Sequence, residues 1–107
     1  DMSTPTTNVL ASGIEIIGSI RFQNDMHIDG KIDGEILSES GKVTIGQMAD
    51  IKGDINAGEV HVYGHVNGNV RSNRCHLSGN AAVMGDITTG ALSMEQGARL
   101  SGRVEIG

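Results

Sequence analysis

The chain has 107 residues, which suits a single domain with one core. Its 16 glycines, single phenylalanine, single tyrosine and lack of tryptophan exclude a core built on large aromatic side chains, so the buried residues must be Ile, Val, Leu, Met and Ala. The formal net charge of −5 is spread along the sequence. Because phosphate backbones are bound by clustered Lys and Arg with stacking aromatics, a nucleic-acid partner is not expected.

The targeting and redox features of the sequence predict a cytoplasmic protein. One cysteine cannot form an internal disulfide and fits a reducing compartment. No apolar run approaches the roughly 20 residues of a membrane-spanning helix. The first residues also lack the basic and apolar regions of a signal peptide.

The chain is expected to divide into a short tail and one domain. Residues 1–8 are small and polar, contain the only proline and show no apolar periodicity, which predicts a flexible N-terminal tail. Residues 9–107 form the expected domain. From Ile14 onward apolar residues fall on alternate positions, and glycines interrupt any helical i, i+3, i+4 pattern, so the domain is predicted to be all-β.

The alternation changes parity at four polar or glycine-containing segments. Apolar residues and glycines take even positions in 14–36, odd in 43–55, even in 60–70, odd in 75–87 and even in 92–106. Because successive side chains of a strand point to opposite faces, a change of parity marks a place where the chain turns. The predicted turns are 37–42, 56–59, 71–74 and 88–91.

The alternating runs are also translated copies of one another, at a repeat of about 17 residues and with about six copies. The pair Val43 and Ile45 recurs as Val60 and Val62, as Cys75 and Leu77, and as Leu92 and Met94; a Gly-x-Ile or Gly-x-Val phrase recurs at Gly18, Gly34, Gly53, Gly68, Gly85 and Gly102. Hairpins of a meander have no reason to repeat one phrase at one offset, whereas solenoid coils must stack their inward residues. The glycines suit corners, where the backbone needs a flexible φ and little bulk near the axis.

A solenoid leaves strand edges and inward residues uncovered at its first and last coils, and these must be capped or joined. Neither end of this sequence has an obvious cap. The expected contact residues are Ile14, Ile16, Ile20 and Phe22 in the first coil, and Leu100, Val104 and Ile106 in the last. The sequence therefore predicts end-to-end association with other copies of the chain.

Several phrases resemble the core of the bactofilins, a family of bacterial cytoskeletal proteins. They are Ile28-Asp-Gly-Lys-Ile-Asp-Gly-Glu-Ile36, Lys42-Val-Thr-Ile-Gly46, Ala49-Asp-Ile-Lys-Gly-Asp-Ile55, Val66-Asn-Gly-Asn-Val70 and Gly85-Asp-Ile87. The resemblance covers residues 14–107 and implies a right-handed, three-sided parallel β-helix. It further implies polymerisation into nonpolar filaments, through like ends and without nucleotide. The implied role is in cell shape and in placing cell-wall or membrane-associated proteins at the inner face of the cytoplasmic membrane.

The sequence departs from the family pattern at its C-terminal end. Bactofilins often carry a phenylalanine near the end of the core that polymerisation requires, whereas this sequence has no aromatic residue after Tyr63. The terminal contact either uses aliphatic side chains such as Ile106 or lies in residues that follow Gly107. Some members also reach the membrane through a short N-terminal peptide, and residues 2–10 are too polar to support that inference strongly.

No constellation of residues predicts an enzyme, and no catalytic residue or cofactor is expected. Ile45-Gly-Gln-Met-Ala-Asp50 resembles one unit of the hexapeptide acyltransferases, but the six-residue phase does not continue and a coil of about 17 residues is not a multiple of six. The alternatives to a filament scaffold are a solenoid binding module that does not polymerise and a hexapeptide-type acyltransferase. Trimerisation with binding of an acyl donor would favour the latter.

Three of the four histidines fall in one outward column of the predicted solenoid. His27, His61 and His76 precede equivalent inward residues, which places His61 and His76 side by side on neighbouring coils. Adjacent imidazoles could share a zinc ion, but a structural zinc site normally has four ligands and no Cys or carboxylate motif completes one here. A surface column without a metal is expected.

The residues that follow the repeated glycines form a second outward column. Its members include Glu35, Asp54, Asn69, Asp86 and Arg103. These carboxylates are interpreted as a solvated face that keeps the rod soluble rather than as an acid–base pair. Cys75 has inward parity and is predicted to be a small buried apolar residue rather than a reactive thiol.

Overall fold

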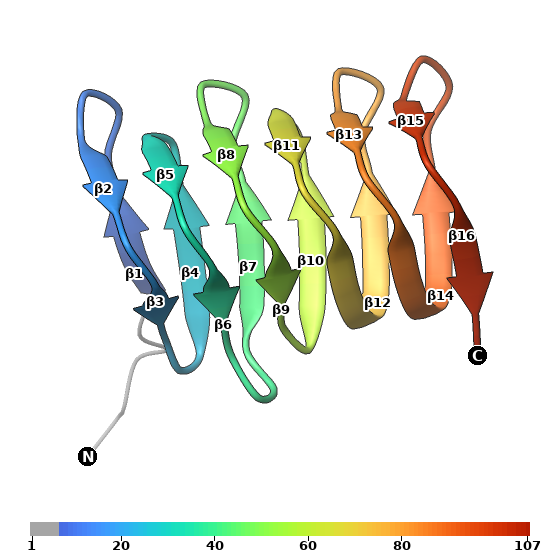
Figure 1. The fold of residues 1–107 in the computed structure, drawn as a ribbon, viewed down its shortest axis with the longest axis horizontal. Coiled ribbons are helices and arrows are strands. Elements are labelled where there is room, and N and C mark those ends of the chain that lie inside the picture. Colours follow the sequence, from blue (N-terminus) through green and yellow to red (C-terminus); the bar gives the residue numbers. More distant parts are fainter. Residues whose placement is uncertain (1–6) are drawn as a thin grey trace.

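The computed structural model describes residues 7–107, which form sixteen short β-strands and no helix (Figure 1). In chain order the strands are β1 (Thr7–Leu10), β2 (Glu15–Ile17), β3 (Ile20–Arg21), β4 (Asp25–Ile28), β5 (Lys31–Asp33), β6 (Ile36–Leu37), β7 (Lys42–Ile45), β8 (Asp50–Lys52), β9 (Ile55–Asn56), β10 (Glu59–Val62), β11 (His65–Asn67), β12 (Val70–Leu77), β13 (Ala82–Met84), β14 (Ile87–Met94), β15 (Arg99–Ser101) and β16 (Val104–Ile106). The predicted all-β fold is confirmed.

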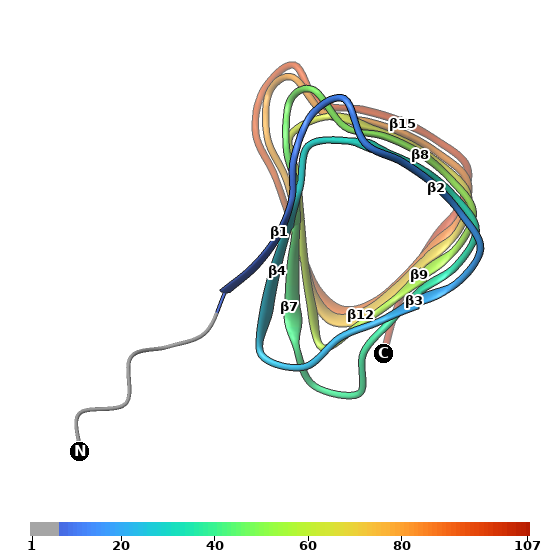
Figure 2. The same cartoon turned by 90° about the vertical axis from the view of Figure 1, so that its left-hand side faces the viewer.

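The strands wind into a solenoid with a three-sided cross-section (Figure 2). The first side stacks β1, β4, β7, β10 and the C-terminal halves of β12 and β14; the second stacks β2, β5, β8, β11, β13 and β15; the third stacks β3, β6, β9, the starts of β12 and β14, and β16. All of these pairings are parallel. Viewed from the N-terminal end, the chain runs clockwise as it recedes, so the solenoid is right-handed, as expected.

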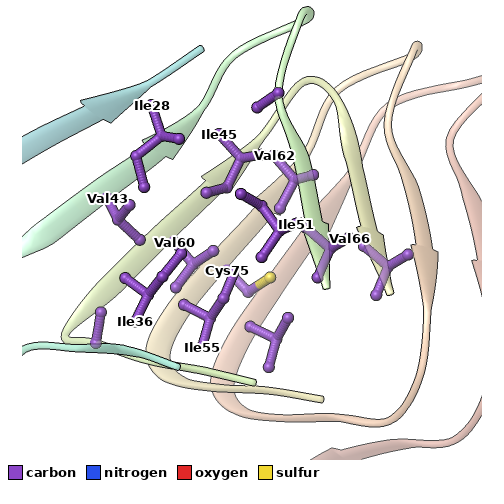
Figure 3. Close-up of a cluster of buried hydrophobic side chains, with 14 of the residues drawn as sticks. Ile28, Ile36, Val43, Ile45, Ile51, Ile55, Val60, Val62, Val66 and Cys75 are labelled. Atoms are coloured by element: carbon purple, nitrogen blue, oxygen red, sulfur yellow. The ribbon is translucent and has the colours of Figure 1, made fainter. Parts of the chain in front are cut away.

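The core consists of aliphatic columns that run along the rod, because each inward side chain lies on its equivalent in the next coil (Figure 3). Their buried members are Met26, Val43, Val60 and Cys75; Ile28, Ile45, Val62 and Leu77; Ile32, Ile51, Val66 and Val83; and Ile36, Ile55, Val70 and Ile87. Full burial of an Ile or Val side chain stabilises the fold by about 1.5–3 kcal/mol. Stacked aliphatic residues therefore replace the aromatic anchors that the composition excludes.

The repeat is not of constant length. Val43 pairs with Val60 at a step of 17 residues, whereas Ile32, Ile51 and Val66 follow one another at steps of 19 and 15. In the 19-residue step the extra residues lie in the two corner loops before and after β7, both of which protrude from the rod (Figure 1). The strands keep their register because length changes are confined to the corners.

A column of glycines forms the corner between the second and third sides. Its members are Gly18, Gly34, Gly53, Gly68, Gly85 and Gly102, with φ angles from 132° to 159°, a region that side chains with a Cβ rarely adopt. From Gly34 onward, an added Cβ would collide with the carbonyl oxygen of the preceding glycine in the column. The bulk limit therefore comes from the neighbouring coil and not from the rod axis, which corrects the reason suggested by the sequence.

The solenoid begins earlier than the predicted boundary between tail and domain. Thr7 and Asn8 belong to β1, where they pair with Asp25 and Met26 of β4. The Asn8 side chain also donates hydrogen bonds to the carbonyl oxygens of Gln23 and Asp25, at 3.2 Å each. Because both residues have polar side chains, the apolar pattern did not indicate a strand here, although the backbone pairs with β4. The rest of the predicted tail, residues 1–6, lies outside the described residues, so its flexibility stays a prediction.

Candidate functional site: the two end coils

The C-terminal coil, residues 91–107, ends each interior column with a side chain that is covered on one face only. Val104 and Ile106 pair with Ile87 and Thr89 of the preceding coil, which are 0% and 1% exposed. Val104 and Ile106 themselves are 40% and 55% exposed. The difference arises because another coil covers Ile87 and Thr89. A further coil stacked on this end would bury both apolar side chains.

The N-terminal coil, residues 7–22, is also apolar but is less uniform. Ile16 and Ile20 continue the interior columns and are half-buried against the second coil, and Ile14 is 47% exposed at the corner between the first and second sides. Two outward residues, Val9 and Ile17, are exposed as well. This coil therefore presents apolar surface both on its end and around its outer edge.

Backbone groups at both ends have open hydrogen-bonding edges. Within residues 7–107, β1, β2 and β3 pair only with the second coil, and β15 and β16 pair only with the preceding coil. Unpaired N–H and C=O groups along a strand edge are a template for another strand. Each end thus combines apolar side chains with an edge that can extend the sheets.

The seven sequence-predicted contact residues all lie in the end coils, but they differ in accessibility. Leu100 is half-buried like Ile16 and Ile20. Phe22 is only 8% exposed, because its ring packs beside the loop that ends at Gly41. A charge at Phe22 would therefore act on the fold as well as on any contact. The interface role of all seven residues stays a prediction.

Sequence reasoning omitted Met94, Val9 and Ile17 from the end surfaces. Met94 was detectable, because it ends the same column as Ile45 and Leu77. Val9 and Ile17 have outward parity, and an isolated outward apolar residue gives no signal without the structure.

The residues after the glycine corner do more than face solvent. Oδ1 of Asp54 accepts a hydrogen bond from the backbone N–H of Asn69, Oδ1 of Asn69 accepts one from Asp86, and Oδ1 of Asp86 accepts one from Arg103, all at 2.9 Å. We call these four residues the corner ladder. The interpretation of this column as a solvated face was incomplete, because its side chains join successive coils.

The first side carries a column of alternating charge next to the histidines. Glu59 lies between Lys42 and Arg74 of the neighbouring coils, and its Oε2 is 2.6 Å from Nε2 of His61. The hydrogen bond with His61, the charge on its ring and the charges of Lys42 and Arg74 together lower the pKa of the Glu59 carboxyl, against the opposing effect of partial burial. The ionised form of Glu59 therefore contributes to stability.

Replacing Glu59 with glutamine is expected to reduce stability more at pH 7 than at pH 3. A carboxyl whose pKa is lower in the folded state contributes stability above its unfolded pKa, about 4.3, and loses it as the pH falls through the folded value. Urea unfolding of the wild type and Glu59→Gln at both pH values measures the difference. Glu39→Gln, in the exposed loop between β6 and β7, is the matched control. An equal gap between wild type and Glu59→Gln at pH 3 and pH 7 would contradict the assignment.

The remaining candidate chemistry in the described residues is sparse. Cys75 is buried, as its parity predicted, and desolvation raises the pKa of its thiol to about 11, so it is protonated at neutral pH. No group of three or more His, Cys, Asp or Glu side chains in residues 7–107 is placed to hold a metal ion. Within the same residues, no helix of the length and hydrophobicity needed to span a membrane is present.

The structure thus defines a class of protein, a right-handed parallel β-solenoid with apolar, open-edged ends. The family model of the bactofilins, described as polymer-forming cytoskeletal, matches residues 8–105. Bactofilin BacO of Myxococcus xanthus (strain DK1622) is 30% identical over 99 residues, which cover 92% of this chain and 78% of that protein. The structure of the cytoskeletal bactofilin BacA, determined by solid-state NMR, matches with a TM-score of 0.82 and 32% identity, covering 92% of this chain and 93% of that one.

The chain belongs to the bactofilin family. The resemblance drawn from the number and order of the phrases between Ile28 and Ile87 is therefore confirmed. Bactofilins are structural proteins of the cytoskeleton and form polymers. The open ends of this solenoid are consistent with membership of such a family.

Proposed function

We propose that this protein is a structural scaffold whose copies join end to end into filaments without nucleotide. The observation that carries the proposal is the contrast between Ile87 and Thr89, which are covered, and Val104 and Ile106, which have the same position one coil later but are half-exposed. A second copy would cover this end as a further coil does. Family membership supports the scaffold over an acyltransferase or a binding module that does not polymerise.

The joints are proposed to be between like ends, which gives a nonpolar filament. Both ends are apolar, so an end does not require an unlike surface to cover it. One observation favours the opposite arrangement. If unlike ends met in register, Arg99 of one copy would lie next to Glu15 of the following copy in one outward column, and Glu105 would lie next to Arg21 in another. A head-to-tail filament is therefore the second candidate.

Filaments of the wild-type chain are the direct test. Negative-stain electron microscopy and sedimentation at physiological salt, without nucleotide or metal, should show fibres and pelletable protein. Samples with ATP, GTP and EDTA serve as controls and should give the same result. Discrete particles under all conditions, at protein concentrations of tens of micromolar, would contradict the proposal.

The cellular role follows from the same assembly. We place the filaments in the cytoplasm, along the inner face of the membrane, where they bear on cell shape and on the position of cell-wall or membrane-associated proteins. A filament with three repeating outward faces offers many identical binding positions, which supports such a scaffold. Flotation of filaments with anionic lipid vesicles tests the membrane part separately.

A further inference from the structure

We infer that His61 and His76 form a binding site for a divalent transition-metal ion on the first side of the solenoid. The two residues are paired neighbours in one outward column, on β10 and β12. Their ring centroids are 5.6 Å apart, with an interplanar angle of 41°. Their side chains are 23% and 27% exposed. The rings are therefore close together and partly exposed to solvent.

The separation of the rings is near the value that coordination requires. Imidazole nitrogens bind zinc at about 2.0–2.1 Å, which puts each ring centroid about 3.2 Å from the ion and two centroids about 5.2 Å apart at a tetrahedral angle. The observed 5.6 Å exceeds this only slightly. Small rotations about the side-chain torsions bring the two rings to an ion without moving the strands.

The hydrogen bonds of the two rings leave one nitrogen of each ring for the metal. Nε2 of His61 is hydrogen-bonded to the Glu59 carboxylate, and Nδ1 of His76 lies 3.0 Å from Oγ of Ser93. The other nitrogen of His76, Nε2, is 4.0 Å from Oε1 of Glu95, beyond hydrogen-bonding distance. Metal-bound histidines commonly donate a hydrogen bond to an oxygen through the ring nitrogen that does not bind the metal. The carboxylates of Glu59 and Glu95 also favour a nearby cation.

Two imidazoles and solvent define the class of ion. Because residues 7–107 contain no third ligand in place, water completes the coordination sphere. Imidazole favours Cu²⁺, Zn²⁺ and Ni²⁺ over Mg²⁺ and Ca²⁺, and Cu²⁺ binds a given nitrogen site most tightly. The site therefore differs from the four-ligand structural zinc site, for which the sequence offered no motif.

The other histidines of the chain lack a second imidazole and provide matched controls. In its column His27 is flanked by Val9 and Thr44. His65, on the second side, is flanked by Asp50 and Ala82.

Equilibrium dialysis of the untagged protein against CuCl₂, and separately against ZnCl₂, measures binding whether or not the chain is assembled. We expect one Cu²⁺ per chain, bound at least about tenfold more weakly after His61→Asn or His76→Asn. His27→Asn and His65→Asn should leave binding unchanged. Equal binding by all four variants, or an equal loss in all four, would overturn the site.

A second measurement does not depend on any variant. The electron paramagnetic resonance spectrum of the Cu²⁺-loaded wild type should show superhyperfine coupling to two imidazole nitrogens. A spectrum with oxygen donors alone, or with one nitrogen, would overturn the pair even if a variant failed to fold. Loss of filaments does not affect either measurement, so this inference and the proposed function fail independently.

Discussion

Replacing Ile106 with arginine is expected to abolish filaments and leave particles of two subunits. Ile106 is half-exposed at the end of the rod, so the folded monomer tolerates the change. In a joint, the guanidinium would have to be desolvated against apolar side chains, which costs several kcal/mol without a partner. If like ends join, the N-terminal ends remain free to pair. Analytical ultracentrifugation and electron microscopy measure the size of the particles.

The corresponding change at the other end separates the two possible filament polarities. Ile14→Arg is preferred to a charge at Phe22, because Ile14 is exposed and Phe22 is buried. With like-end joints, Ile14→Arg and Ile106→Arg each give dimers and the double variant gives monomers. With head-to-tail joints, each single variant already gives monomers.

A charge on an outward face, outside the two end coils, is the control for these variants. Met84 is exposed on the outward face of β13, between β11 and β15 of the second side, in the coil before the last. Met84→Arg is expected to leave filaments intact. Filaments of normal length from both Ile14→Arg and Ile106→Arg would contradict the assignment of the end coils as the joints.

Gly68→Ala is expected to destabilise the fold by roughly 2–6 kcal/mol, a large part of the total stability of a small domain. An alanine at this position would have to adopt a φ of 159°, which is unfavourable for a residue with a Cβ. The Cβ would also collide with the carbonyl oxygen of Gly53. Since each strand lies on its neighbour, the backbone cannot move away from the contact without breaking the pairing of β11 or β12. Urea unfolding in the Ile106→Arg background measures the effect without a contribution from assembly.

The first member of the glycine column isolates the collision from the backbone strain. Gly18 also has a positive φ, 132°, but an added Cβ would meet no atom within 4 Å. Gly18→Ala should therefore cost only the strain, about 1–3 kcal/mol. If Gly18→Ala and Gly68→Ala cost the same, the contact with the preceding coil does not explain the glycine column.

Two of the three corners left a signal in the sequence. The repeated glycines marked the corner between the second and third sides, and a change of parity marked the corner between the third and first sides. Between the third and first sides, inward residues such as Ile55 and Val60 or Val70 and Cys75 are an odd number of positions apart, so the parity changes. At the other two corners the separation is even, as from Val62 to Val66 and from Val66 to Val70. The apolar residues keep the same parity across such a corner, so their alternation gives no sign that the chain turns there.

Two features of the fold were beyond the reach of an apolar pattern. Ser72 and Thr89 were assigned to turns, yet both are buried, and their hydroxyl oxygens are 3.2 Å apart inside the corner. The corner ladder was also missed, because the acceptor role of Asp54 or Asn69 depends on which backbone N–H lies above it. By contrast, the pairing of His61 with His76 was predicted correctly, since register alone determines it.

The corner ladder has a mechanical consequence for the rod. Each oxygen of the ladder reaches towards the C-terminal end, and the last position, Arg103, has no side-chain acceptor to offer a following coil. Coils within one molecule are held by the continuous chain and, from Asp54 onward, by the ladder as well, whereas a joint between molecules has neither. Under tension, we expect the polymer to fracture at its joints, so that broken fibres consist of whole, still-folded subunits that can anneal again.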